Sequence, residues 1–240
     1  MENLLFSPNF NKSKRSIASI KAIVIHYTGM QSERESIKRL CDPLSKVSCH
    51  YLINLNGKIY KLVKETNIAW HAGKSCWGNY NNLNKISLGI ELVNRGHQFG
   101  YTKFKKKQIS SLVKLCKKLI RKYKINKKNV IGHSDIAPLR KIDPGEKFPW
   151  EYLSKKKIGI WHSYQKNFLK KYRKLKVVEK NDKKKFIRFL SKIGYCNQIN
   201  KDKTYSKITM AFQRHFRKEL VNGALDRECF IIAQNLCKKL

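Results

Sequence analysis

Two histidines that each follow a short apolar run are the first candidates for chemistry in this sequence. His26 comes directly after Ala-Ile-Val-Ile (22–25), and His133 directly after Val-Ile-Gly (130–132). An imidazole at the end of a buried strand lies at the mouth of a sheet, a common place for a ligand or catalytic group. A single such histidine is more often a hydrogen-bonded structural residue, but two of them indicate a shared site.

An aspartate that precedes a proline follows His133 along the chain. Pro144 disfavours a helical backbone at Asp143 and holds it extended. In extended chain, side chains alternate, so Lys141 and Asp143 project to the same side while Ile142 points to the other. We therefore expect this segment to present a carboxylate and an ammonium group together on one side.

His26, His133 and Asp143 together supply the donors of a catalytic zinc site. Two neutral imidazoles and one carboxylate form a three-ligand set that leaves the fourth tetrahedral position to water. Zinc lowers the pKa of such water toward about 7, which makes hydroxide available at neutral pH. We predict Zn2+ as the cofactor and hydrolysis as the reaction.

Hydrolysis also needs a base, and Glu91 is the candidate. It lies in the middle of the apolar segment Ser-Leu-Gly-Ile-Glu-Leu-Val (87–93), where an acid must be paired or functional. Lys141 would stabilise the oxyanion that forms when a carbonyl carbon becomes tetrahedral. The alternative is a structural role for Glu91, as a buried salt bridge to Lys141.

The elements that must position these residues alternate between strands and helices. Strands are expected at 22–25, 50–53, 58–62, 87–93 and 129–132, and the Asn-Gly turn at 56–57 joins two of them as a hairpin. A capping box at 32–35 predicts a helix after it, and apolar residues at helical spacing from 109 to 123 predict the clearest helix. The sequence therefore predicts an α/β fold, with a mixed central β-sheet flanked by helices.

The C-terminal part is expected to form a small three-helix domain. Helices are predicted around 186–193, 208–216 and 230–237, with Asp182 and Asp226 as caps of the first and third. Residues 155–185 mix charged and aromatic side chains without a clear period. We place the boundary there, which gives domains at 1–178 and 179–240.

The charge of the chain is unusual. Among 240 residues, 53 Lys and Arg against 16 Asp and Glu give a formal net charge of +37. Such a field attracts polyanions, with nucleic acid as the obvious candidate. The basic residues are dispersed along the whole chain, which is typical of solvated surface, so nucleic-acid binding is expected to be non-specific at most.

The cysteines give information about the cellular compartment of the protein. All seven lack a CxxC partner and their number is odd, so a disulfide framework is not expected. Free thiols fit a reducing compartment, and no segment approaches the about 20 apolar residues of a membrane span. No signal segment is visible, so the sequence predicts a cytoplasmic protein, with a periplasmic or wall-associated location as the alternative.

Five segments of this sequence resemble the zinc-dependent N-acetylmuramoyl-L-alanine amidases of type 2, which share a fold with peptidoglycan recognition proteins. The segments are IHYTG (25–29), SCHYLI (48–53), AWHAG (69–73), SLGIELVN (87–94), and GHSDIAP with KIDPG (132–145). They occur in the family's order. The AmiD-like subgroup, which carries a C-terminal helical module, is the most similar.

The resemblance implies zinc on His26, His133 and Asp143, a general base at Glu91, and Lys141 at the scissile carbonyl. It also implies a substrate groove with four further residues: Trp70, His71, Asn84 and His50. A structural role is as compatible with the position of His50. Residues 179–240 resemble a peptidoglycan-binding three-helix domain.

The predicted function is hydrolysis of the amide between N-acetylmuramic acid, or its anhydro form, and the L-alanine of peptidoglycan or muropeptides. The partners would be peptidoglycan or its fragments. One alternative is a non-catalytic peptidoglycan-binding protein that uses the same groove, and a second is a basic nucleic-acid-binding protein. Inactive members of the family lack zinc ligands, and this chain keeps all three.

Overall fold

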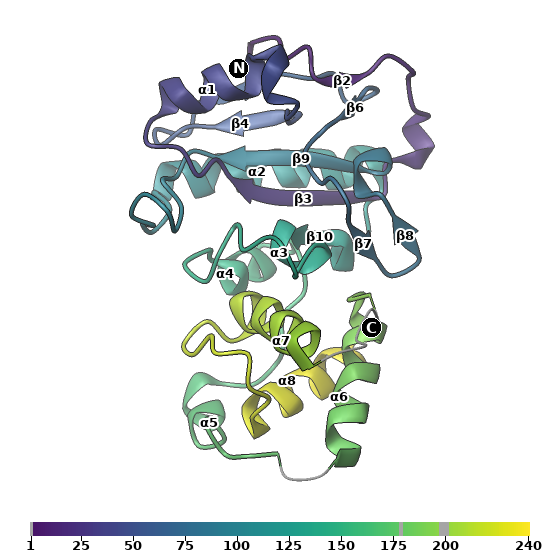
Figure 1. The fold of residues 1–240 in the computed structure, drawn as a ribbon, viewed down its shortest axis with the longest axis vertical. Coiled ribbons are helices and arrows are strands. Elements are labelled where there is room, and N and C mark those ends of the chain that lie inside the picture. Colours follow the sequence, from purple (N-terminus) through teal and green to yellow (C-terminus); the bar gives the residue numbers. More distant parts are fainter. Residues whose placement is uncertain (1, 178–179, 197–201) are drawn as a thin grey trace.

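A mixed β-sheet forms the first part of the molecule, as predicted, and it has six strands, of which the N-terminal one at 2–4 was not predicted. The computed structural model describes residues 2–177, 180–196 and 202–240. The strand order is β1-β5-β4-β9-β3-β10 (Figure 1). The strands are β1 (Glu2–Leu4), β3 (Ala22–Tyr27), β4 (Tyr51–Ile53), β5 (Ile59–Lys61), β9 (Ser87–Leu92) and β10 (Val130–Gly132).

The centre of the sheet is parallel and almost entirely buried. β3 runs parallel to both β9 and β10, and β4 pairs in parallel with β9. Apolar, β-branched residues such as those of β3 suit this position because both faces of the strand are covered. The antiparallel pair β4 and β5 is the predicted hairpin, and Gly57 takes the positive φ of 83° that its turn requires.

Two long helices flank the sheet. The Ser32 hydroxyl accepts a hydrogen bond from the Glu35 backbone N–H at 3.1 Å, which caps α1 (Glu33–Cys41) as predicted. The amphipathic helix α2 (Lys106–Tyr123) runs behind β9 and β3 in Figure 1. Ile23 and Ile25 of β3 belong to the same core as the apolar side of α2. The alternate side chains of β3 therefore project to the other face, where the candidate site lies.

Shorter elements complete the first part. Two short helices lie at 150–155 and 166–170, the second of them within the stretch 155–185 that showed no clear period in the sequence. The remaining strands pair as β2 (Phe10–Asn11) with β6 (Ile68–Ala69), and β7 (Cys76–Trp77) with β8 (Tyr80–Asn81). The short α-helices are α3 (His133–Ile136), α4 (Trp150–Lys155) and α5 (Lys166–Lys170), and the 3-10 helices are η1 (Ile17–Ser19), η2 (Pro43–Ser45), η3 (Leu83–Lys85) and η4 (Lys127–Asn129).

Three helices follow near the C-terminus: α6 (Lys180–Ile193), α7 (Asp202–Phe216) and α8 (Arg227–Lys238). The Asp226 carboxylate accepts a hydrogen bond from the Cys229 backbone N–H at 2.9 Å and caps α8 as predicted, whereas α6 begins before Asp182. Apolar side chains of these helices and of β3, β7 and α3 form one continuous core. The domain boundary predicted at 178 falls outside the described residues and stays a prediction.

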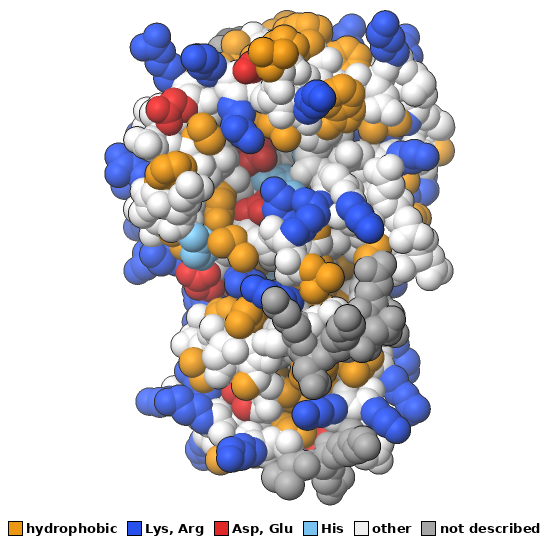
Figure 2. Space-filling view, viewed as in Figure 1, with side chains coloured by type: hydrophobic (Ala, Val, Ile, Leu, Met, Phe, Trp, Pro, Cys, Tyr) orange, Lys and Arg blue, Asp and Glu red, His pale blue; other side chains and the backbone are white. Residues whose placement is uncertain are grey.

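Basic side chains are spread over the molecular face seen in Figure 2, with no single large patch, in line with the dispersed charge of the sequence. Within the described residues, no helix combines the length and apolar character of a membrane span.

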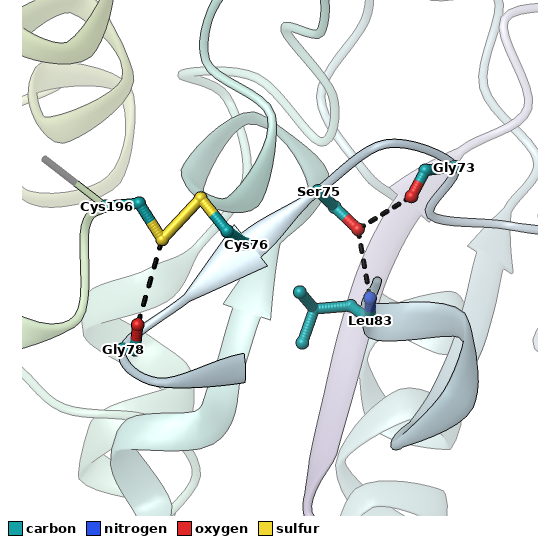
Figure 3. The surroundings of a disulfide bond; sticks show 6 residues. All are labelled: Gly73, Ser75, Cys76, Gly78, Leu83 and Cys196. Carbon is teal, nitrogen blue, oxygen red and sulfur yellow. Dashed lines mark hydrogen bonds between the residues drawn. A yellow bond between two sulfur atoms is a disulfide. The ribbon is translucent and has the colours of Figure 1, made fainter. Parts of the chain in front are cut away.

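A disulfide joins the two parts of the chain, and the expectation of free thiols throughout was wrong on this point. Cys76 of β7 is bonded to Cys196, which follows α6, with a Cα–Cα distance of 6.1 Å (Figure 3). The two cysteines are 120 residues apart, so no local spacing in the sequence could indicate the pair. The remaining five are free, and Cys116 is buried among apolar residues as expected.

Candidate active site

Neighbouring strands bring the two histidines together. The register of β3 and β10 pairs Ile25 with Gly132. His26 is the next residue of β3, and His133, the first residue of α3, directly follows the end of β10, so the two emerge side by side at the same edge of the sheet. The Ser134 backbone N–H donates to the Asp143 carbonyl at 2.8 Å, which holds Asp143 next to them.

Three ligand atoms face one another at this point. The Nδ1 atoms of His26 and His133 are 3.0 Å apart, and each is 3.1 Å from the Asp143 Oδ2. Donor atoms about 2.0 Å from a tetrahedral zinc ion lie about 3.3 Å from each other, so this triangle has the size that zinc requires. All three residues are buried, and they form a group capable of holding a metal ion.

The protonation states suit metal binding. Burial and the neighbouring His133 lower the pKa of His26 to about 4, so its imidazole is neutral at pH 7 and keeps a free lone pair. Burial by itself would raise the pKa of Asp143, but the neighbouring His133 and the hydrogen bonds to both histidines hold it well below the usual range. The set therefore offers a neutral nitrogen on His26 and an ionised carboxylate on Asp143.

Glu91 lies on the same face of the sheet as His26. The two residues are register partners in the parallel strands β9 and β3, so both side chains project to the side away from α2. The Glu91 Oε2 is buried and has no hydrogen-bond partner among the described residues. Burial, and then the negative charge of Asp143, raise the pKa of Glu91 to about 8, while the charge of Lys141 opposes this rise.

Lys141 influences Glu91 by its charge at a distance. No ion pair joins the two side chains among the described residues, so the structure does not contain the salt bridge considered as the alternative. Lys141 and Asp143 both line the cleft. Ile142 lines it as well, so the cleft is not reached by Lys141 and Asp143 alone, and residues 138–140 before this segment form a turn instead of a strand.

The ligand triangle lies at the bottom of an open cleft of about 560 Å³. In Figure 2, acidic and histidine side chains gather in a hollow beside a group of basic ones. Glu91, Lys141, Trp70 and His71 are among the residues that line the cleft. Its rim therefore combines an aromatic ring, a carboxylate and a positive charge around the three ligand atoms.

His71 lies directly behind His26. Its Nδ1 is 3.1 Å from the His26 Nε2, and its Nε2 is 3.2 Å from the Ser87 hydroxyl. Ser87 donates its own proton to the Leu83 carbonyl at 2.6 Å, so it accepts from His71 Nε2–H, and His71 Nδ1 is left to accept from His26. This chain of hydrogen bonds directs the free Nδ1 of His26 toward Asp143.

Asn84 and His50, two further residues of the groove implied by the resemblance, do not line this cleft. The Asn84 side-chain oxygen accepts hydrogen bonds from the backbone N–H groups of His71 and Ala72 at 3.1 and 2.7 Å. His50 is fully buried, and its Nδ1 accepts from the Gly89 N–H at 3.0 Å. Asn84 thus supports the segment that carries His71, and His50 has the surroundings of a structural residue.

Arg140 is a cleft residue that the sequence reasoning missed. Its guanidinium donates to the carbonyl oxygens of Ala72 and Lys74. The Ala72 carbonyl is also 3.1 Å from the His133 Nε2, so Arg140 and His133 share this acceptor. The only signal in the sequence was its position next to Lys141 in the segment that leads to Asp143.

Comparison with known proteins gives a family match and several curated relatives. Residues 16–146 match the family described as N-acetylmuramoyl-L-alanine amidase. N-acetylmuramoyl-L-alanine amidase AmiD of Escherichia coli is 40% identical over 236 residues, which cover 92% of this chain and 83% of AmiD. The 1,6-anhydro-N-acetylmuramyl-L-alanine amidase AmpD of Haemophilus influenzae is 35% identical over 62% of this chain and 88% of its own length.

Solved structures agree as well. The complex of Escherichia coli AmiD with the substrate anhydro-N-acetylmuramic acid-L-Ala-D-gamma-Glu-L-Lys matches with a TM-score of 0.82 at 37% identity, covering 95% of this chain and 92% of that one. AmpDh3 from Pseudomonas aeruginosa in complex with anhydromuramic pentapeptide matches with a TM-score of 0.80 at 32% identity, covering 95% and 94%.

The fold and the site thus define an amidase of type 2, with a mixed sheet that carries a His-His-Asp group at its edge. The chain belongs to the N-acetylmuramoyl-L-alanine amidase family, and its similarity to AmiD extends through the C-terminal helices.

Proposed function

We propose that this chain is a zinc-dependent N-acetylmuramoyl-L-alanine amidase. Its substrate would be the amide between the lactyl group of N-acetylmuramic acid, in the ordinary or anhydro form, and L-alanine. The observation that carries the proposal is the triangle of His26, His133 and Asp143 atoms at the bottom of a cleft that also contains an unpaired carboxylate. The substrates named for AmiD and AmpDh3 support the choice of bond.

Zinc on these three atoms would supply Lewis acidity and lower the pKa of water toward about 7. In this proposal Glu91 accepts the proton of the attacking water and passes it to the leaving amide nitrogen. The water oxygen bonds to the carbonyl carbon, the carbon–nitrogen bond breaks, and the peptide leaves as a free amine. Lys141 stabilises the negative charge that develops on the carbonyl oxygen.

The remaining cleft residues orient these groups. His71 accepts from His26 and thereby fixes the imidazole's orientation, while Trp70 offers an indole surface on the rim, with its Nε1–H donating to Asn11 at 2.6 Å. Aromatic faces suit the apolar faces of sugar rings. We assign Trp70 to substrate binding and His71 to the support of the ligand set.

The disulfide favours a periplasmic or wall-associated location over the predicted cytoplasm. Disulfides form and persist in oxidising compartments and are rare where thioredoxin and glutathione keep thiols reduced. The Cys76–Cys196 bond therefore supports peptidoglycan of the wall, and fragments released from it, as the substrates.

Mass spectrometry of reaction products tests the proposed function. Purified protein loaded with zinc is incubated with an anhydro-muropeptide and, separately, with soluble glycan strands that carry stem peptides. The expected products are the free sugar and a peptide with an L-alanine amino terminus. Bound zinc without release of either product would support the non-catalytic alternative instead.

A further inference from the structure

A buried carboxylate connects the C-terminal helices to a residue that would hold the metal. Asp135 belongs to α3, which begins with His133, and only 1% of its surface is exposed. Its Oδ2 accepts the Gly132 backbone N–H at 2.8 Å. This bond fixes the start of α3 relative to β10, because Gly132 is the last residue of that strand.

The other two donors to this carboxylate come from the C-terminal part of the chain. The Tyr195 hydroxyl donates to Asp135 Oδ1 at 2.6 Å, and His215 Nδ1 lies 2.7 Å from Oδ2. Both residues are buried. Asp135 therefore accepts one hydrogen bond from its own segment and two from the C-terminal helical part of the chain.

The two donors are themselves held firmly. His215 stacks on Trp150 of α4, with ring centres 3.9 Å apart and planes at 15°. The Tyr195 ring packs edge to face on Trp77 of β7 at 5.1 Å. Trp77 in turn lies against Gly194, where an added Cβ would come within 2.3 Å of the indole, so only glycine allows this approach.

Next to this contact, the Cys76–Cys196 disulfide closes the same junction covalently (Figure 3). The Gly78 backbone N–H also donates to the Gly194 carbonyl at 2.6 Å. The hairpin of β7 and β8 and the end of α6 thus meet over α3. The orientation of α3 therefore affects two of the three ligand residues. His133 is the first residue of α3, and the backbone N–H of the next residue, Ser134, donates to the Asp143 carbonyl at 2.8 Å.

We propose that Tyr195 and His215 are positioning residues for the metal site and act through Asp135. The proposal rests on the proposed function, because it assumes that zinc binds to His133. It gives the C-terminal helices a role in shaping the active site that is independent of any binding to the wall. A carboxylate buried without its donors is unfavourable, so loss of either donor should shift α3 and spread the ligand atoms.

The test compares zinc affinity among full-length variants by competition with a chromophoric chelator. Tyr195→Phe and His215→Phe remove one donor each, and the second keeps an aromatic ring against Trp150. We expect zinc affinity to fall by about tenfold or more in each, as is typical when partners of metal ligands are removed. Tyr205→Phe is the matched control, because it removes a tyrosine hydroxyl from α7, whereas the side-chain donors to Asp135 are Tyr195 and His215.

A double variant separates positioning from general stability. If Tyr195 acts through Asp135, then adding Tyr195→Phe to Asp135→Asn should change zinc affinity by less than twofold, while both single changes weaken it. Melting temperatures of the metal-free proteins are measured in parallel. Equal zinc affinity in Tyr195→Phe, His215→Phe and Tyr205→Phe overturns the inference even if melting temperatures fall. A wild-type chain that binds no zinc would instead overturn the proposed function.

Discussion

The proposed role of Glu91 as general base depends on its surroundings in the cleft. Its carboxylate shares a cleft with the ligand triangle yet has no ion-pair partner among the described residues. A buried acid without a partner destabilises a fold, and such groups persist where function requires them. Glu91 therefore fits a base better than a structural acid.

The variant Glu91→Gln tests this assignment. It keeps the size of the side chain and removes the proton acceptor, so hydrolysis should fall by about two to four orders of magnitude. Zinc content should match that of the wild type, as measured by elemental analysis of the purified protein. If zinc is lost together with activity, Glu91 is a ligand or a structural residue.

The raised pKa of Glu91 also predicts how stability depends on pH. Its pKa is raised from 4.5 to about 8 in the folded chain, so as pH increases the unfolded chain gives up this proton first. The stability that Glu91 contributes is therefore fully present below its pKa in the unfolded chain. It is lost as pH rises toward its pKa in the folded chain. Glu91→Gln abolishes this decrease.

Denaturant titrations of the two metal-free proteins at several pH values check this expectation. The free energy of unfolding of Glu91→Gln should exceed that of the wild type by a few kcal/mol above pH 8, with the difference shrinking as pH falls toward 4. A difference that is constant across this range would show that the Glu91 carboxylate titrates normally.

At the scale of elements, the strands bring distant segments to one edge of the sheet. The patterns at 22–25, 87–93 and 129–132 predicted the strands β3, β9 and β10, because buried parallel strands need continuous apolar runs. The pairing of His26 with Glu91 could not be predicted, since register depends on which strands become neighbours. Neither could the disulfide, whose cysteines meet only after the C-terminal helices pack.

The role of His71 could not be predicted from the sequence either. Its motif indicated a groove residue, and it does line the cleft, but its two hydrogen bonds make it the partner of His26. The space that it occupies is provided by Gly89 of β9, where an added Cβ would lie 2.4 Å from the His71 ring. A glycine in the middle of a strand often marks such a close approach.

Gly89→Ala should therefore disturb the proposed metal site by displacing His71, the partner of His26. We expect the His71 ring to move and zinc affinity to fall by about tenfold or more. Leu88→Ala is the control, because this neighbour is buried on the opposite face of the strand, against the core of α2. It should lower stability and leave zinc affinity unchanged. Equal zinc affinity in the two variants would contradict the hydrogen-bonded role of His71.

At the scale of the whole molecule, the disulfide links the amidase part to the C-terminal helices. Cross-linking residues so far apart in the chain restricts the unfolded state, and loss of such a bond costs about 2–4 kcal/mol. Cys196→Ser should lower the melting temperature by roughly 5–15 °C. Reduction of the wild type should have the same effect, whereas Cys41→Ser, which changes a free cysteine, should have little.

Thiol counting gives an independent check of the disulfide. Protein purified without reductant and then denatured should expose five reactive thiols, one for each free cysteine. A count of seven would show that both cysteines of the pair are reduced, and it would return the cytoplasm as the favoured location.

The most direct test of the central claim is a zinc titration of the metal-free protein, followed by the rate of amide hydrolysis of an anhydro-muropeptide. We predict that the rate rises with zinc and saturates at one ion per chain, and that Asp143→Ala neither binds this ion nor hydrolyses the amide. Hydrolysis that persists without zinc, or an Asp143→Ala protein that remains active, would contradict a zinc amidase built on His26, His133 and Asp143.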